Sequence, residues 1–197
     1  LLHFILTADI LFLGIMVTET ILITGGAGYI GSHACVALLA AGFDVVVLDN
    51  FCNSHPEALV RVQKIAGKPV ALYRGDLRDR TILDRTFREH KVSAVMHFAG
   101  LKAVGESCGN PLMYYDNNVV GTIHLLQAMQ AHAVQRLIFS SSATVYRPTD
   151  VMPLDETAAL GASNPYGQTK QMIEHVLMDL SASTNWQVAL LRYFNPV

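Results

Sequence analysis

The sequence is poor in charged residues and in cysteine. Only 15% of its 197 residues are charged, and the formal net charge is -2. This balance offers no basic surface for gripping nucleic acid, so we expect no nucleic-acid partner. The three cysteines, Cys35, Cys52 and Cys108, lie far apart and are odd in number, which argues against a disulfide framework and against a zinc site. The composition therefore favours a protein of the reducing cytoplasm without a bound metal.

Residues 1–15 are largely apolar but lack the features of a targeting or membrane segment. They have no basic first region and no small-residue cleavage site, and His3 and Asp9 interrupt them. They are also shorter than the roughly 20 apolar residues that span a bilayer. We expect an extension outside the fold and no membrane partner, with the domain occupying 16–197 and Met16 able to serve as the native start. A membrane or partner anchor is the alternative.

From residue 20 onwards, short apolar runs alternate with amphipathic stretches. Strands are predicted at 20–24, 44–48, 70–73, 94–98, 136–140 and 188–192. Helices are predicted at 29–41, 111–133 and 165–180, with another around Leu83 and Phe87. Such alternation indicates parallel strands joined by right-handed crossovers. Because hydrophobic residues make up 51% of the chain, the sheet can be buried on both faces. We therefore predict one α/β domain with a doubly wound parallel sheet.

A glycine-rich turn separates the first predicted strand from the first predicted helix. Gly25, Gly28 and Gly31 form a GxxGxxG pattern, which suits a tight turn and a close backbone approach to a pyrophosphate. The helix N-terminus then offers free N–H groups to phosphate. Asp49 ends the second strand, where an acid can accept hydrogen bonds from ribose hydroxyls and repel a 2′-phosphate. The combination predicts a Rossmann-type site that prefers NAD to NADP. A glycine turn of purely structural use is the alternative.

Two further segments follow predicted strands. Asp76 comes after the third strand, and its carboxylate either reaches the adenine amino group or stays solvated. Phe98, Ala99 and Gly100 leave the fourth strand, and small residues there allow backbone to lie against a cofactor. The same Ala-Gly pair is also ordinary loop chemistry, so position alone leaves both assignments open.

Ser142, Tyr166 and Lys170 are the candidate catalytic residues. Tyr166 and Lys170 are four residues apart on a predicted helix, so they share one face. A lysine ammonium near a phenol favours the phenolate and lowers the pKa of the tyrosine, and the positive nicotinamide ring of NAD+ would act in the same direction. A tyrosine tuned in this way can take a proton from an alcohol while hydride leaves the same carbon. Ser142 follows the fifth strand, at the carboxyl edge where open α/β sheets bind ligands. A surface Tyr–Lys pair is the alternative.

Six stretches carry a resemblance to a known family. The chain resembles the extended branch of the short-chain dehydrogenase/reductases and, within it, the UDP-glucose 4-epimerases. The similar stretches are 25–33, 49–54, 98–107, 114–118, 140–146 and 192–197. This resemblance implies an isomerase of galactose metabolism that oxidises C4 of the sugar with bound NAD and returns the hydride to the other face. It also implies UDP-glucose and UDP-galactose as partners, and a homodimer.

The resemblance also implies roles for individual residues. Tyr29 and Ile30 would contact the pyrophosphate, while Asp76 and Leu77 would flank the adenine. The adenosine ribose would be bound by Asp49, Asn50, Phe51, Cys52, Asn53 and Ser54. The rest of the NAD site would be formed by Phe98, Ala99, Gly100, Leu101, Lys102, Asn117, Ser142, Tyr166, Lys170 and Phe194. Tyr166 would be the base with Ser142 assisting, and the UDP-sugar would be contacted by Lys102, Ser142, Tyr166 and Asn195.

The chain departs from the family pattern in two ways. Arg147 stands where the family has glycine, and Val120 where it has asparagine. If position 147 needs a positive φ, arginine costs on the order of 1 kcal/mol there. The second departure is that the chain stops where the family's substrate domain begins, so we expect the fragment alone to be inactive.

Two other functions stay open. A nucleotide-sugar 4,6-dehydratase is disfavoured, because 143–145 offers no carboxylate for elimination. A non-catalytic remnant that binds NAD is the other.

The first testable prediction concerns cofactor choice. A 2′-phosphate would meet the Asp49 carboxylate, so we expect NAD to bind more tightly than NADP. Calorimetric titration of the chain with both nucleotides measures this difference. Equal or tighter binding of NADP would show that Asp49 does not face the ribose.

Overall fold

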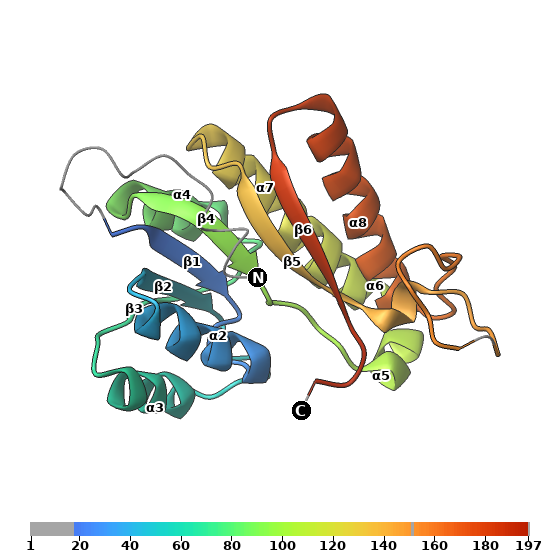
Figure 1. The fold of residues 1–197 in the computed structure, drawn as a ribbon, viewed down its shortest axis with the longest axis horizontal. Coiled ribbons are helices and arrows are strands. Elements are labelled where there is room, and N and C mark those ends of the chain that lie inside the picture. The colour runs from blue at the N-terminus through green and yellow to red at the C-terminus, as the bar shows by residue number, and fades with distance from the viewer. Residues whose placement is uncertain (1–17, 151, 197) are drawn as a thin grey trace.

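A computed structural model describes residues 18–150 and 152–196, and shows a parallel sheet with helices on both faces (Figure 1). The expected extension at 1–15 lies outside these residues. The six strands are β1 (Thr20–Thr24), β2 (Asp44–Asp49), β3 (Ala71–Arg74), β4 (Val92–His97), β5 (Arg136–Ser142) and β6 (Gln187–Tyr193). The helical elements are α2 (Tyr29–Ala40), α3 (Glu57–Ala66), α4 (Arg80–Glu89), α5 (Val104–Gly109), α6 (Pro111–Tyr114), η1 (Tyr115–Val120), α7 (Gly121–Ala131), η2 (Ala143–Val145) and α8 (Pro165–Ser183).

The strand order in the sheet is β3-β2-β1-β4-β5-β6, and every pairing is parallel. The chain therefore winds outwards from β1 to β3, crosses back, and winds outwards again from β4 to β6. This is the doubly wound Rossmann arrangement, so the fold prediction is confirmed. The order reverses between β1 and β4, and open α/β sheets bind ligands in the crevice at that point.

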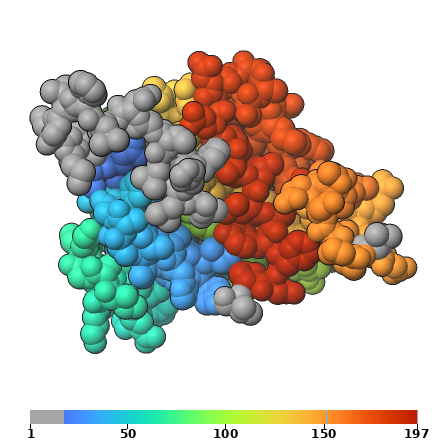
Figure 2. Space-filling view, in the orientation of Figure 1, coloured from blue at the N-terminus to red at the C-terminus, as the bar shows by residue number. Residues whose placement is uncertain are grey.

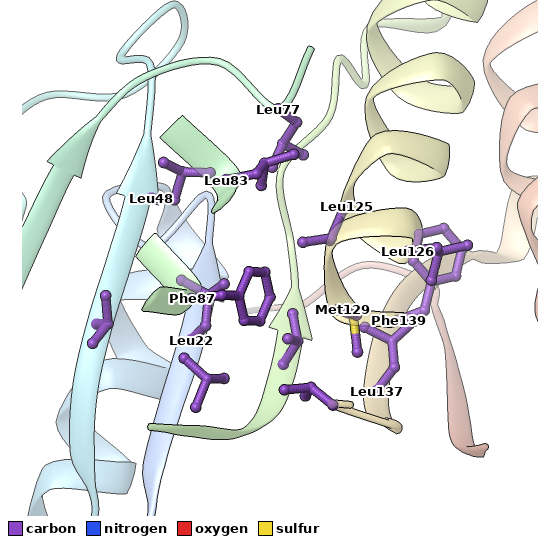
Figure 3. Close-up of a cluster of buried hydrophobic side chains, with 14 of the residues drawn as sticks. Leu22, Leu48, Leu77, Leu83, Phe87, Leu125, Leu126, Met129, Leu137 and Phe139 are labelled. Atoms are coloured by element: carbon purple, nitrogen blue, oxygen red, sulfur yellow. The ribbon is translucent and has the colours of Figure 1, made fainter. Parts of the chain in front are cut away.

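Two apolar cores fix the helices to the sheet. One core joins α4, α7 and α8 to one face, and Figure 3 shows Phe87, Leu125 and Phe139 among its side chains. The other core packs Cys35 and Leu59, from α2 and α3, against the opposite face. Alternation along the strands decides which residues reach which core: Leu22 faces the first, whereas Ile21 and Ile23 face the second. Burial on both faces explains the apolar strands.

The predicted strands all exist, with boundaries shifted by two residues or fewer. Sequence reasoning missed α3 and α5. The end signals of α3 were available, because Pro56 precedes it and Gly67 terminates it in the left-handed conformation, with φ 64°.

The single long helix predicted at 111–133 is replaced by three segments. α6 leads into the π-helical turn η1, and α7 continues from there. The Thr122 hydroxyl, in the first turn of α7, donates to the main-chain carbonyl of Asn118 in η1 at 2.5 Å. Hydroxyl bonds of this kind compete with the main-chain hydrogen bonds of a helix, and π-turns recur at functional sites.

The two residues that differ from the family pattern, Arg147 and Val120, do not strain the backbone. Phe51 and Ala133 are the positive-φ non-glycine residues of the described ranges, so Arg147 pays no left-handed penalty. Its N–H donates to the Ala159 carbonyl at 2.9 Å. Val120 ends η1 with 40% of its surface exposed, a position that tolerates a change of side chain. Figure 2 shows the orange segment before α8 projecting at one side of the molecule.

Across 18–150 and 152–196, no helix has the length and apolar character needed to span a membrane.

Gly31 gives a stability test of the close packing between the glycine turn and α2. A Cβ at Gly31 would lie 2.3 Å from the Gly25 carbonyl oxygen and 2.8 Å from the Gly26 Cα, so the backbone itself must move. We expect Gly31→Ala to lower the free energy of unfolding by about 2–3 kcal/mol.

Urea unfolding of the variant measures this loss. Gly105→Ala is the matched control, because a Cβ there meets nothing within 4 Å. A Gly31 variant as stable as the Gly105 variant would contradict the expectation.

Candidate active site

A cavity of about 530 Å³ opens at the carboxyl edge of the sheet. It is lined by residues from the glycine turn, the ends of β2 to β6 and the start of α8. The predicted site residues line it with three exceptions, Phe51, Ser54 and Leu101. Sequence reasoning missed the lining residues Leu48, Gly75, Val104, Ser140, Ser141, Thr144, Tyr193 and Pro196. Most of these are strand-end neighbours of residues that were predicted.

The glycine turn packs directly on the backbone that leaves β4. Gly25 has φ 69°, and a Cβ on it would lie 2.6 Å from the Ala99 nitrogen. Its own N–H donates to the Leu48 carbonyl at 2.9 Å. Gly28 then caps α2 without a side-chain hydrogen bond, which leaves first-turn N–H groups free of a side-chain acceptor. The turn therefore presents backbone donors and a helix N-terminus to the cavity.

Asp49 is a buried carboxylate that joins two loops of the site. It accepts hydrogen bonds from the Ala27 N–H at 2.9 Å and from the Phe51 N–H at 2.8 Å. The Ser54 hydroxyl donates to it at 2.8 Å. Phe51 and Ser54 therefore hold Asp49 in place instead of lining the cavity, while Asn50, Cys52 and Asn53 do line it.

Asp76 is held by Arg78, a residue that sequence reasoning missed. Nε and Nη2 of Arg78 donate to the two carboxylate oxygens at 2.9 and 2.8 Å, and Nη1 donates to Asp116 at 2.5 Å. The Asn50 amide donates to Asp76 at 3.0 Å. The Arg78 guanidinium holds the pKa of Asp76 well below its usual range, despite partial burial. The signal was the Asp-x-Arg spacing, since a planar guanidinium two residues away can bind a carboxylate through two donors.

Asn118, also missed, holds the backbone that leaves β4. Its side chain accepts from the Leu101 N–H at 2.8 Å and donates to the Leu101 carbonyl at 3.0 Å. It also donates to the Thr169 hydroxyl on α8 at 3.1 Å. Leu101 is therefore an anchoring residue, and the neighbouring Asn117 lines the cavity. The available signal was the stretch 114–118, which carries the family resemblance and contains both asparagines.

His97 at the end of β4 is buried and neutral. Burial and, to a smaller extent, the charge of Lys170 lower the pKa of His97 to about 3. Its ring lies between the hydroxyls of Thr24 and Thr122, at 2.6 and 2.8 Å. Because Thr122 donates its proton to Asn118, it must accept from Nε2–H, which leaves Nδ1 to accept from Thr24. His97 thus ties β1 to the π-turn without carrying charge.

The three candidate catalytic residues line the same cavity. Asn164 caps α8 by accepting from the Gly167 N–H at 2.9 Å, and the Ser107 hydroxyl accepts from the Tyr166 N–H at 3.2 Å. Nζ of Lys170 donates to the Ser140 carbonyl at 2.8 Å and lies 6.0 Å from the centre of the Tyr166 ring. The first turn of α8 is therefore fixed from both sides.

Burial raises the pKa of Tyr166, and a hydrogen bond from Ser142 opposes this rise. The Lys170 ammonium donates to the Ser140 carbonyl and lies 4.7 Å from the centre of the Phe139 ring. The lowering of the Tyr166 pKa by Lys170 together with the nicotinamide ring stays a prediction. Burial also lowers the pKa of Lys170 to about 8, against the raising influence of Glu174.

The strand order, the glycine turn and the Ser–Tyr–Lys set define a Rossmann domain of the short-chain dehydrogenase/reductase class. The profile of the NAD dependent epimerase/dehydratase family matches residues 21–197, and the chain belongs to this family.

The similar proteins include UDP-glucose 4-epimerases from several organisms. The Bacillus subtilis enzyme is 57% identical over 177 residues, which are 89% of this chain and 52% of that protein. UDP-glucose 4-epimerase 1 of Oryza sativa is 55% identical, covering 91% of this chain and 52% of that protein. The crystal structure of the Bifidobacterium longum enzyme with NAD+ and UDP superposes with a TM-score of 0.88 at 50% identity, covering 91% of this chain and 54% of that one. The chain thus spans about half the length of the curated relatives it matches.

Titration of Tyr166 tests the influence of burial on this phenol. We expect it to ionise above the ordinary value of 10.0, and the loss of the opposing hydrogen bond in Ser142→Ala to raise its pKa further. Ultraviolet difference spectra between each protein and its Tyr166→Phe counterpart isolate the phenolate, with circular dichroism at every pH to confirm the fold. A midpoint at or below 10.0 in the unaltered chain would contradict the dominance of burial.

Proposed function

We propose that the cavity binds NAD and that this chain is the NAD-binding half of a UDP-glucose 4-epimerase. The single observation that carries the proposal is that the candidate catalytic residues and the dinucleotide-binding turn line one cavity. Tyr166, Lys170 and Ser142 open into the same cavity as the glycine turn and Asp49, at the reversal point of a Rossmann sheet. A surface Tyr–Lys pair would not share a cavity with a dinucleotide fingerprint.

The residues present fit NAD. Gly25 and Gly31 leave room where a Cβ would collide with backbone, so the turn can approach a pyrophosphate closely. First-turn N–H groups of α2 face the anionic group. Asp49 lies beside Asn50 and Cys52, where it suits ribose hydroxyls and repels a 2′-phosphate. Asp76 and Leu77 line the end assigned to adenine, while Phe98, Lys102 and Phe194 line the remainder.

When bound, NAD would supply the hydride acceptor and donor, and the chain's residues would handle the proton. Tyr166 would accept the proton of the C4 hydroxyl and later give it back, while Ser142 would donate a hydrogen bond to the same oxygen. Burial raises the pKa of the phenol, so a positive charge arriving in the site would favour loss of its proton. Lys170 contributes a buried cation 6.0 Å from the ring centre.

The reacting sugar is proposed to be the hexose of UDP-glucose or UDP-galactose. Lys102 and Asn195 line the cavity and are available to contact it. The relatives named above are epimerases of this substrate, and the B. longum structure holds UDP. The homodimer and the cytoplasmic location stay predictions from the sequence.

In the described part of the chain, the cavity lacks the carboxylic acid that a nucleotide-sugar 4,6-dehydratase would need beside the sugar. Among the described residues that line the cavity, the carboxylates are Asp49 and Asp76, both assigned to the adenosine end. Ser142 is followed by Ala143, Thr144 and Val145 in η2, and the Thr144 hydroxyl donates to Ser142 at 2.9 Å. An elimination reaction needs a carboxyl group beside the reacting sugar, so this geometry favours epimerisation.

The activity test compares three proteins with NAD and UDP-galactose supplied, and a coupled assay detects UDP-glucose. The proteins are the 197-residue chain, residues 16–197 joined to the remaining half of the B. subtilis enzyme, and this fusion with Tyr166→Phe. We expect turnover only in the fusion with tyrosine, because remote binding energy from the nucleotide must place C4 over the cofactor. Calorimetry with NAD runs in parallel. A folded fusion that binds NAD but is inactive, or turnover that survives loss of the Tyr166 hydroxyl, would overturn the proposal.

A further inference from the structure

Glu174 is a buried carboxylate that the proposed chemistry does not use. It has no exposed surface and lies on α8, one turn after Lys170. Nε and Nη2 of Arg192 on β6 donate to it at 3.0 and 2.8 Å. The Ser141 hydroxyl on β5 also donates to it, at 2.5 Å. The carboxylate is thus enclosed between the helix and the two strands beneath it.

One face of α8 engages three consecutive serines at the end of β5. The face carries Tyr166, Lys170 and Glu174, spaced four residues apart. Lys170 binds the Ser140 carbonyl at 2.8 Å, and Glu174 binds the Ser141 hydroxyl. Ser142 lines the same cavity as Tyr166 and opposes the rise that burial causes in the pKa of Tyr166. Glu174 therefore helps to align α8 with the end of β5. The other two residues on this face of the helix, Tyr166 and Lys170, belong to the site.

The charges around Lys170 come from few groups. Tyr166 and Glu174 face it from α8, the neutral His97 acts from β4, and Arg192 lies on the far side of Glu174. Burial disfavours the ammonium form, and Glu174 is the group that opposes this effect. Without that negative charge, a cation enclosed in this core would lose its proton more readily.

An ion pair is a poor choice for stability alone. Taking both charges out of water costs more than their attraction returns in many proteins, and apolar pairs of the same volume hold elements together as well or better. An apolar pair would neither accept from Ser141 nor place a negative charge beside Lys170. The ion pair between Glu174 and Arg192 thus supplies a hydrogen-bond acceptor for Ser141 and a negative charge near Lys170, and the packing of β6 on α8 requires neither.

We propose that Glu174, locked by Arg192, is a positioning residue that keeps Lys170 charged and holds Ser140–Ser142 in register under Tyr166. This proposal rests on the proposed function, because that function is what assigns Tyr166, Lys170 and Ser142 to the active site. The claim about Lys170 rests on the burial of both side chains and on their spacing of four residues along α8, and it can be measured without cofactor or substrate.

The test follows the protonation of Lys170 directly. The full chain, labelled with 13C-lysine, contains five lysines, and Lys170→Met assigns the Lys170 signal. We expect Glu174→Gln to move the titration midpoint of Lys170 downward by on the order of one pH unit. Asp179→Asn is the matched control, because it removes one carboxylate from an exposed position of the same helix and leaves the midpoint in place.

The double variant Glu174→Gln/Arg192→Gln separates two effects on the Lys170 midpoint: the loss of the Glu174 charge and the presence of an unpaired Arg192. In the single variant the half-buried Arg192 guanidinium loses its carboxylate partner, which costs stability and lets its positive charge lower the pKa of Lys170 further. The double variant removes both charges, so we expect a folded protein whose Lys170 midpoint is still lowered. A midpoint equal to that of the unaltered chain in the folded double variant overturns the proposal. Failure of the unaltered chain to bind NAD would refute the proposed function instead, and would leave this measurement intact.

Discussion

The close approach of the Gly25 turn to the Ala99 backbone is the constraint on which the cavity depends. β1 and β4 are neighbours, and the chain leaves both strands at the same edge. A side chain at Gly25 would push these two exits apart, because its Cβ would lie within 3 Å of backbone atoms of Phe98 and Ala99. With glycine there, the N-terminus of α2, the loop after β2 and the loop after β4 surround one space. Asp49 then fastens the glycine turn to the loop after β2.

Buried polar groups do the remaining positioning, and each has a specific partner. His97 stays neutral between two threonines, and Asn118 holds both backbone groups of Leu101. No buried side-chain nitrogen or oxygen in the described part of the chain lacks a hydrogen bond. Satisfied networks of this kind hold a single arrangement, because breaking one bond leaves a desolvated group without a partner. The loop after β4 is therefore fixed before any ligand arrives.

The candidate catalytic residues Tyr166 and Lys170 lie at the start of α8, where burial shifts the pKa values of both side chains. Burial alone would leave Tyr166 protonated and push Lys170 towards neutrality. A positive charge brought into the cavity would favour the phenolate form of Tyr166. The buried ion pair beneath Lys170 belongs to the same electrostatic arrangement.

Local sequence patterns determined the strands, the glycine turn and the identity of the reactive residues. Apolar runs and helical spacing depend on neighbours in the chain, and so do the turn at Gly25 and the shared face of Tyr166 and Lys170. The tertiary structure decided which groups meet across the fold. It turned Phe51, Ser54 and Leu101 into anchors, broke the helix around Asn118 into a π-turn, and brought Arg78 and Glu174 to their partners. It also set the burial of Tyr166 and the orientation of Lys170, because both are properties of the packed molecule that no spacing along the sequence encodes.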